Sequence, residues 1–183
     1  SRIGTEAEIE ALKHGVAQFY PMLEGYPVLS EEASRFVKNF MDVDIRPEGI
    51  IPTVGAMQAS YVAFMALTEC HKGKDTILFI DPGFPVQKTQ LEVIGKPYQT
   101  FDIYEYREEK LREYLDRGNI AGIVYSNPNN PSWVCLTDFE LQVIGKLATE
   151  YDTIILEDLA YFAMDFRKDL SHPGKAPFQP TVA

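Results

Sequence analysis

The chain has 183 residues, of which 45% are hydrophobic and 12% aromatic, a composition typical of a folded globular protein with a substantial core. Its formal net charge of −10 argues against sequence-independent binding to nucleic acid or to an anionic membrane surface, because both kinds of binding require a basic patch. Cys70 and Cys135 lie far apart and lack the spacing of a metal site, so we expect free thiols in a reducing compartment and no bound metal. No apolar run approaches the roughly 18 residues of a membrane span, which leaves a small-molecule partner and a cytoplasmic location as expectations.

The first part of the chain is expected to form a helical arm. Residues 6–19 have the pattern of a helix, and a break before Pro27 separates them from a second one. A serine followed by two glutamates is typical of a helix start, and it predicts a helix over residues 31–41. We assign residues 1–44 to this N-terminal arm.

From Ile50 onward, short apolar runs alternate with helical patterns. Strands are expected over residues 76–80, 97–101, 120–125 and 153–156, and helices over residues 56–70, 86–94, 108–117 and 137–151. This alternation is the signature of a parallel sheet covered on both faces, so residues 45–183 are predicted to form a three-layer α/β/α domain with a mostly parallel sheet. The tail, residues 167–183, is rich in Pro, Gly, Lys and Ser and is expected to be a loop.

Polar residues follow three of these strands at their carboxyl ends, where open parallel sheets bind ligands. Residues 81–85 (Asp-Pro-Gly-Phe-Pro) follow the first strand, residues 127–132 (Asn-Pro-Asn-Asn-Pro-Ser) follow the third, and Asp158 and Tyr161 follow the fourth. Each pattern is also compatible with an ordinary turn or helix cap. Because side chains alternate along a strand, Asp158 and its neighbour Glu157 are expected to face opposite ways.

A possible anion site precedes the predicted helix over residues 56–70. Residues 53–58 (Thr-Val-Gly-Ala-Met-Gln) lie at its start, where backbone amides without helical partners and the helix dipole favour a negative charge. Gly55 would let a phosphate group approach the backbone closely. The alternative is a glycine turn before an ordinary amphipathic helix.

Taken together, the motif Asn-Pro-x-Asn-Pro-Ser over residues 127–132 and the motif Asp-x-x-Tyr over residues 158–161 resemble the large domain of class I/II aminotransferases. These are fold-type I enzymes that depend on pyridoxal 5′-phosphate (PLP). The resemblance covers about residues 50–161, with four weak signals in the expected order. It implies an enzyme that moves an amino group between an amino acid and a 2-oxo acid.

The resemblance also implies a role for each candidate residue. The cofactor phosphate would be bound by Gly55, Ala56 and Met57, and Phe84 would stack on the pyridine ring. Asn130 and Tyr161 would donate hydrogen bonds to the cofactor's O3′. Asp158 would hold the pyridine nitrogen protonated, which strengthens the ring as an electron sink. Asp158 and Tyr161 are therefore the predicted catalytic residues, and all seven are predicted to bind the cofactor.

The chain departs from the family pattern in several places. The family has Gly after the Ser or Thr of the first motif, whereas this chain has Trp133. Lys168 and Lys175 lack the sequence context of the Schiff-base lysine, and the family's carboxylate-binding arginine is not found. We therefore expect a part of a larger enzyme, inactive in transamination by itself and homodimeric at full length. Tyr20 resembles the tyrosine that family members send to the neighbouring subunit's phosphate, although a packed loop explains it equally.

Three alternatives stay open at this point. The same cofactor and fold also serve β-eliminating lyases, and aminotransferase-like domains occur as ligand sensors in transcription regulators. A plain dinucleotide-binding domain is disfavoured, because no Gly-x-Gly-x-x-Gly follows a predicted strand.

Overall fold

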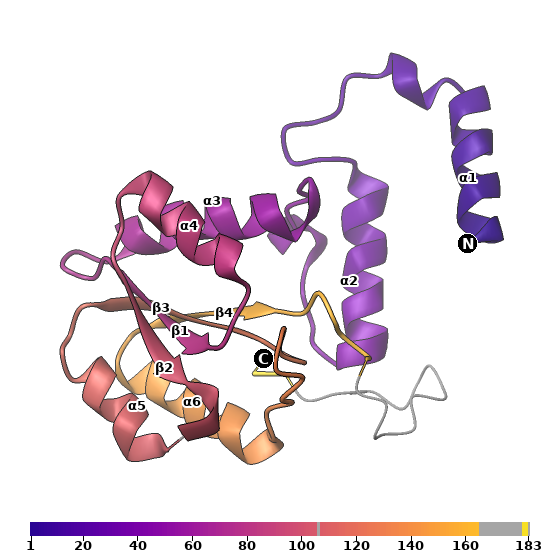
Figure 1. Ribbon diagram of the computed structural model, residues 1–183. Helices are drawn as coiled ribbons and strands as arrows, with labels where there is room; N and C mark the ends of the chain where they lie inside the picture. The colour runs from indigo at the N-terminus through magenta and orange to yellow at the C-terminus, as the bar shows by residue number, and fades with distance from the viewer. Residues whose placement is uncertain (106, 165–180, 183) are drawn as a thin grey trace.

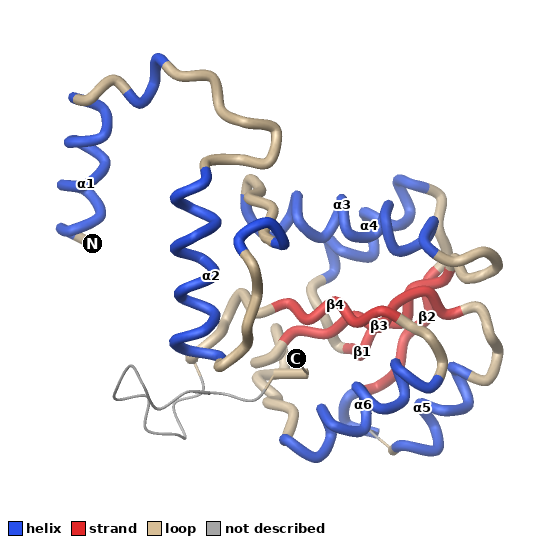
Figure 2. Tube along the Cα trace, turned by 180° about the vertical axis from the view of Figure 1, so that it is seen from behind, coloured by secondary structure: helices blue, strands red, loops and turns tan. Residues whose placement is uncertain are grey.

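The computed structural model describes residues 1–105, 107–164 and 181–182. Its centre is a parallel four-stranded sheet with the order β2-β1-β3-β4, formed by β1 (Thr76–Asp81), β2 (Tyr98–Asp102), β3 (Ile120–Ser126) and β4 (Ile154–Asp158). Helices α3 (Gly55–Cys70) and α4 (Pro85–Ile94) lie on one face, and α5 (Glu108–Leu115) and α6 (Asp138–Glu150) lie on the other (Figure 1, Figure 2). The predicted three-layer α/β/α class with a parallel sheet is confirmed.

The strands divide the hydrophobic core into two halves, because alternate side chains point to opposite faces. Ile77 and Phe79 of β1 pack with side chains of α3 and α4. Leu78 and Ile80 pack with side chains of α5 and α6. At Gly122 of β3, a Cβ atom would lie 3.1 Å from the Leu67 side chain, so the glycine allows α3 to approach the sheet closely. Burial on both faces explains why β1 and β3 read as nearly continuous apolar runs.

The four predicted strands and four predicted helices of this domain are all present, with ends displaced by at most two residues. All four strands end later than predicted, at Asp81, Asp102, Ser126 and Asp158, because their parallel pairing continues into the polar residues. Cys70 and Cys135 carry thiols that are not joined in a disulfide, as expected. Apart from Thr181 and Val182, the tail over residues 167–183 lies outside the described residues, as do Lys168 and Lys175.

The bounds predicted for the two N-terminal helices were wrong. Helix α1 spans Arg2–Lys13, and the Ser1 side chain caps its start. Gly15, at φ +77°, ends the helical conformation and leads into a short 3₁₀ turn, η1 (Val16–Gln18). Helix α2 spans Pro27–Met41 and begins at the proline, whose fixed φ and missing N–H suit the first helical position. Two further 3₁₀ turns, η2 (Pro47–Gly49) and η3 (Ile103–Glu105), lie in the connections that follow.

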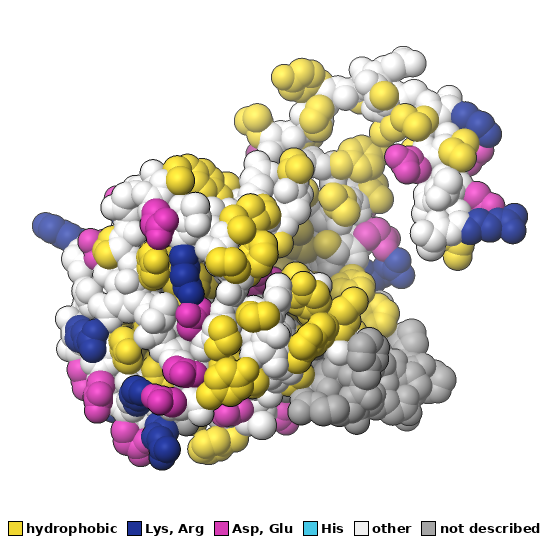
Figure 3. Space-filling model, viewed as in Figure 1, with side chains coloured by type: hydrophobic (Ala, Val, Ile, Leu, Met, Phe, Trp, Pro, Cys, Tyr) yellow, Lys and Arg dark blue, Asp and Glu magenta, His cyan; other side chains and the backbone are white. Residues whose placement is uncertain are grey.

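The arm formed by α1 and α2 stands beside the sheet domain and carries many exposed apolar side chains (Figure 1, Figure 3). Helix α1 buries no residue, while α2 touches the domain through the rings of Phe36 and Phe162, whose centroids are 6.3 Å apart. Between the helices, Tyr20 is 98% exposed and Leu23 is 100% exposed, so the packed-loop explanation of Tyr20 is wrong within this chain. No helix in the described part of the chain is both long and apolar enough to cross a membrane.

Candidate cofactor site

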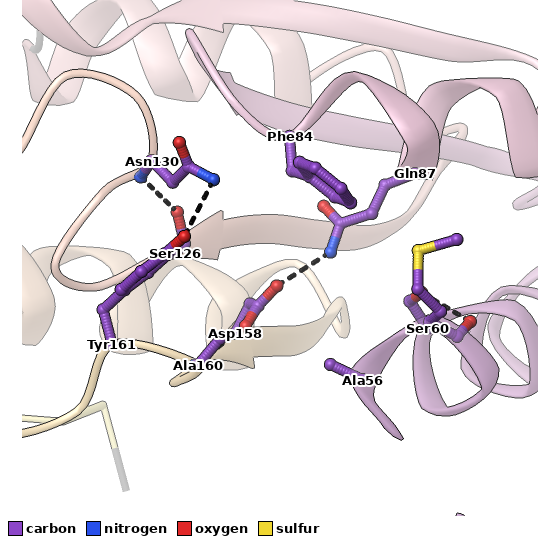
Figure 4. Close-up of a pocket in the computed structure, with 10 residues that line it drawn as sticks. Ala56, Ser60, Phe84, Gln87, Ser126, Asn130, Asp158, Ala160 and Tyr161 are labelled. Carbon is purple, nitrogen blue, oxygen red and sulfur yellow. Dashed lines mark hydrogen bonds between the residues drawn. The ribbon is translucent and has the colours of Figure 1, made fainter. Parts of the chain in front are cut away.

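A pocket opens at the carboxyl edge of the sheet, between the ends of β3 and β4 and the first turns of α3 and α4. Its volume is about 160 Å³, and it is lined by Ala56, Met57, Ser60, Phe84, Gln87, Ser126, Asn130, Asp158, Ala160 and Tyr161 (Figure 4). The chain passes from β1 outward to β2 and then returns to form β3 on the other side of β1. Such a reversal of strand order leaves a crevice in open parallel sheets, and the pocket lies at that edge.

Asp158, the last residue of β4, is the carboxylate of this pocket. Its Oδ2 accepts a hydrogen bond from Gln87 Nε2 at 3.0 Å, and its Oδ1 accepts one from the Ala160 amide at 3.0 Å (Figure 4). Each carboxylate oxygen therefore has a neutral donor, which fixes the orientation of the group. Of the ten lining residues, only Asp158 and Tyr161 have ionisable side chains.

The neighbouring Glu157 faces the other side of the sheet, as alternation along the strand predicted. Its Oε2 accepts a hydrogen bond from the Val182 amide at 3.2 Å, away from the pocket. Burial raises the pKa of the Glu157 carboxyl, and hydrogen bonds, that of Val182 first among them, offset part of this rise. Asp158 is thus the one member of the acidic pair that reaches the pocket.

Asn130 and Tyr161 come together across the gap between two segments far apart in the chain. The Asn130 side-chain amide donates to the Tyr161 hydroxyl at 3.3 Å, and the Asn130 backbone amide donates to Ser126 Oγ at 3.1 Å (Figure 4). Both side chains therefore present polar atoms to the same end of the pocket.

The turn after Asn130 is fixed by the buried Asn129 and ends in an unusual residue. Asn129 Oδ1 accepts from both the backbone amide and the hydroxyl of Ser132, at 3.1 and 2.6 Å. Trp133 follows with φ +57°, and its ring packs against the ring of Tyr161 at a centroid distance of 5.5 Å and an interplanar angle of 61°. Three peptide bonds near the pocket are cis: Asp81–Pro82, Asn127–Pro128 and Asn130–Pro131.

The opposite end of the pocket is formed by the first turn of α3 and by Phe84. Gly55 has φ +74°, a conformation that favours glycine, and a Cβ there would meet no atom within 4 Å. The backbone before Ala56 and Met57 is thus open to an approaching group, and the first amides of the helix lack helical partners. Phe84 precedes α4 with its side chain 38% exposed and its ring directed into the pocket (Figure 4).

Six of the seven residues predicted from the sequence line this pocket, and Gly55 directly precedes two of them. Tyr20 does not belong to it. Sequence reasoning missed Ser60, Gln87, Ser126 and Ala160. Gln87 left a usable signal, because it lies three residues after Phe84 and so on the same face of α4, where it is a buried polar side chain. Among the described residues, no group of three or more His, Cys, Asp or Glu side chains is arranged to hold a metal ion.

Comparison with known proteins gives a consistent result. The sequence model of the family "Aminotransferase class I and II" matches residues 4–174. An aspartate aminotransferase from Pyrococcus horikoshii is 28% identical over 180 residues, which cover 96% of this chain and 44% of that protein. An asparagine–oxo-acid transaminase from Streptococcus mutans is 26% identical over 160 residues, covering 85% of this chain and 40% of that protein. The chain thus spans about two fifths of the length of such relatives.

Solved structures agree with the sequence comparison. Substrate-bound BacF from Bacillus subtilis has a TM-score of 0.75 at 25% identity, over 90% of this chain and 42% of that one. An alanine aminotransferase from Pyrococcus furiosus has a TM-score of 0.72 at 26% identity, over 84% of this chain and 39% of that one. The sheet and its helices therefore have the fold of these proteins over the part that is shared.

Proposed function

Because the chain belongs to the class I and II aminotransferase family, we propose that it forms part of the PLP-binding large domain of an aminotransferase. The observation that supports this most directly is Asp158. It is a carboxylate at the end of strand β4, held by two neutral donors, and it shares one pocket with an aromatic ring, an amide and a phenol.

The side chains of the pocket fit the functional groups of PLP. The cofactor has a basic ring nitrogen, a ring oxygen O3′, a flat aromatic face and a phosphate. Asp158 would hold the ring nitrogen, Asn130 and Tyr161 would hold O3′, and Phe84 offers an aromatic face. The first turn of α3, with Gly55, Ala56 and Met57, would hold the phosphate through backbone amides and the helix dipole.

The reaction follows from these contacts. Bound PLP supplies an electron sink for the electrons released when the Cα–H bond of an amino acid breaks. Asp158 would hold a proton on the ring nitrogen, because an adjacent carboxylate stabilises the resulting positive charge. The donors on Asn130 and Tyr161 would orient the cofactor and stabilise negative charge on O3′. Gln87 and the Ala160 amide would keep the Asp158 carboxylate in place.

For the whole protein, we propose transfer of an amino group between an amino acid and a 2-oxo acid in the cytoplasm. Relatives named as aminotransferases support this over the lyase and sensor alternatives. We also propose that the Schiff-base lysine has no counterpart within residues 1–183, which is consistent with a pocket lining that contains no lysine among the described residues. The catalytic step would then require a residue that this chain does not supply.

We further propose that the whole protein is a homodimer to which the arm contributes. The exposed Tyr20 and Leu23 support this, because apolar side chains gathered on one exposed segment are typical of protein interfaces. Sedimentation of the chain with Leu23→Ser tests the idea. A dimer that dissociates in this variant would agree with it, and a dimer unaffected by the change would contradict it.

The cofactor proposal is tested by titrating the chain with PLP and following the absorbance and fluorescence of the cofactor. Asp158→Asn keeps the size of the side chain and removes its charge, so we expect PLP binding to weaken at least tenfold, on the order of 1.4 kcal/mol. Asp44→Asn is the matched control, because that carboxylate is 84% exposed on the arm side of the chain. Borohydride is expected to trap no stoichiometric lysine adduct that depends on Asp158.

Two results would count against the proposal. Equal PLP affinity in the unchanged chain and in Asp158→Asn would show that the carboxylate does not hold the cofactor. A stoichiometric adduct at one lysine within residues 1–183, lost in Asp158→Asn, would show that the Schiff-base lysine belongs to this chain.

A further inference from the structure

Trp133 has a backbone conformation that its side chain makes unfavourable. Its φ of +57° lies in the left-handed region, where residues other than glycine are uncommon and bulky ones are outliers. Its ring is 58% exposed, so burial in the core does not account for the residue. A strained residue beside a ligand pocket is a reason to look for a functional contact.

The backbone conformation is imposed by the turn that carries the ring. The Trp133 amide donates to the Asn129 carbonyl at 2.8 Å, and the Asn129 amide donates to the Val134 carbonyl at 2.9 Å. The Asn129 side chain, which is 1% exposed, holds Ser132 as well. These hydrogen bonds hold the backbone of Trp133 in place, and the turn therefore determines where its ring contacts Tyr161.

Tyr161, in contrast, lies beyond the sheet. It follows β4 in a short segment whose backbone bonds are local turns, from Phe162 to Leu159 at 2.9 Å and from Met164 to Tyr161 at 3.0 Å. One hydrogen bond, from Asn130 at 3.3 Å, holds its hydroxyl, and the ring packs against Trp133. A ring on such a segment depends on side-chain contacts for its position.

We propose that Trp133 is a positioning residue for Tyr161: its ring, carried by the rigid turn after Asn130, holds the phenol at the pocket where its hydroxyl meets the Asn130 amide. This inference rests on the proposed function for its importance to the cofactor, since Tyr161 is one of the proposed O3′ donors. Trp133 does not itself line the pocket and acts through Tyr161.

Trp133→Gly and Trp133→Phe separate positioning from a merely structural role. Glycine adopts a positive φ without strain, so Trp133→Gly is expected to keep or raise the urea midpoint while releasing Tyr161. Phenylalanine keeps an aromatic edge against Tyr161 and is expected to behave like the unchanged chain. Phe139→Ala, which removes a ring that is 70% exposed elsewhere, is the matched control.

The position of Tyr161 is read by fluorine NMR of chains labelled with 3-fluorotyrosine. The Tyr161 resonance is identified as the one lost in Tyr161→Phe. In Trp133→Gly we expect this resonance to narrow, because the released ring is more mobile, and we expect the dissociation constant for PLP to rise about two- to tenfold through the loss of one aromatic pair. In Trp133→Phe and Phe139→Ala, the line width of the Tyr161 resonance and the dissociation constant for PLP should stay near the values of the unchanged chain.

The outcomes decide between the two ideas. An unchanged line width of the Tyr161 resonance in Trp133→Gly overturns the positioning role, whatever the affinity for PLP. A released Tyr161 with unaltered PLP affinity overturns its importance to the site. If the resonance narrows but the unchanged chain binds no PLP, the positioning role is supported and the proposed function loses its support.

Discussion

Replacing Gln87 by methionine should destabilise the chain through Asp158. Methionine has a similar length and volume, so the buried position stays filled while the amide that donates to Asp158 Oδ2 at 3.0 Å is lost. Hydrogen bonds to charged groups contribute about 1.5–3 kcal/mol to stability. Asp158 lines an open pocket, where solvent replaces part of the bond, and we therefore expect a loss near the lower limit, about 1.5 kcal/mol.

The assay is urea unfolding followed by far-UV circular dichroism, arranged as a double-mutant cycle. Gln87→Met, Asp158→Ala and the double variant are compared with the unchanged chain. If Gln87 acts through Asp158, the two single losses are not additive, and the coupling free energy should be about 1 kcal/mol. Gln90→Met, on the same helix, serves as the control, because Gln90 donates to the Met57 carbonyl and not to Asp158. Coupling of less than about 0.3 kcal/mol between Gln87 and Asp158 would refute the reasoning.

Three further results are expected. Burial raises the pKa of Glu157 above its ordinary value of 4.5, so the folded chain binds this proton more readily than the unfolded chain does and loses stability as the pH rises above that value. Glu157→Gln should therefore gain in urea midpoint over the unchanged chain between about pH 4 and pH 7, and a constant difference across this range would contradict the assignment. Thr137→Ala should cost about 1 kcal/mol of unfolding free energy, because the capping box with Glu140 begins α6, while Thr149→Ala later in the same helix should cost less; equal losses would count against the cap. Trp133 is the single tryptophan of the chain and contacts Tyr161, so PLP should quench its emission in the unchanged chain and much less in Asp158→Asn, whereas equal quenching would indicate binding elsewhere.

The sheet domain could be predicted because its signals are local and agree with one another. Runs such as residues 120–125 are apolar throughout, which is what burial on both faces of a parallel sheet requires. The polar residues that end these runs, among them Asp158, then mark the edge at which a pocket forms. The structure places six of the predicted site residues around one cavity, although their roles toward a cofactor stay predictions.

What the sequence did not reveal depends on three-dimensional neighbours. The spacing from Phe84 could place Gln87 on the pocket side of its helix, but it could not reveal the hydrogen bond to Asp158, which lies 71 positions later. The helices of the arm were harder to predict for another reason. Their apolar side chains are exposed, so the spacing of these side chains does not mark a face packed against a core of this chain. The start of α2 was misplaced because the serine and glutamates resemble a cap, while the proline before them already provides the first turn.

The pocket is lined by residues of α3, α4, β3 and β4 and of the turns after these strands. These elements are held together by pairing between strands that are distant in the sequence. No short stretch of the chain forms the pocket by itself, so the pocket exists only after the parallel sheet has formed. Formation of this sheet requires contacts between residues distant in the sequence and is therefore a slow step in folding. A molecule that binds there selects the native chain over every partly folded one, and it raises the unfolding free energy in proportion to the logarithm of its concentration. Supply of the ligand would thus set how large a fraction of the folded protein opens again to proteolysis and aggregation.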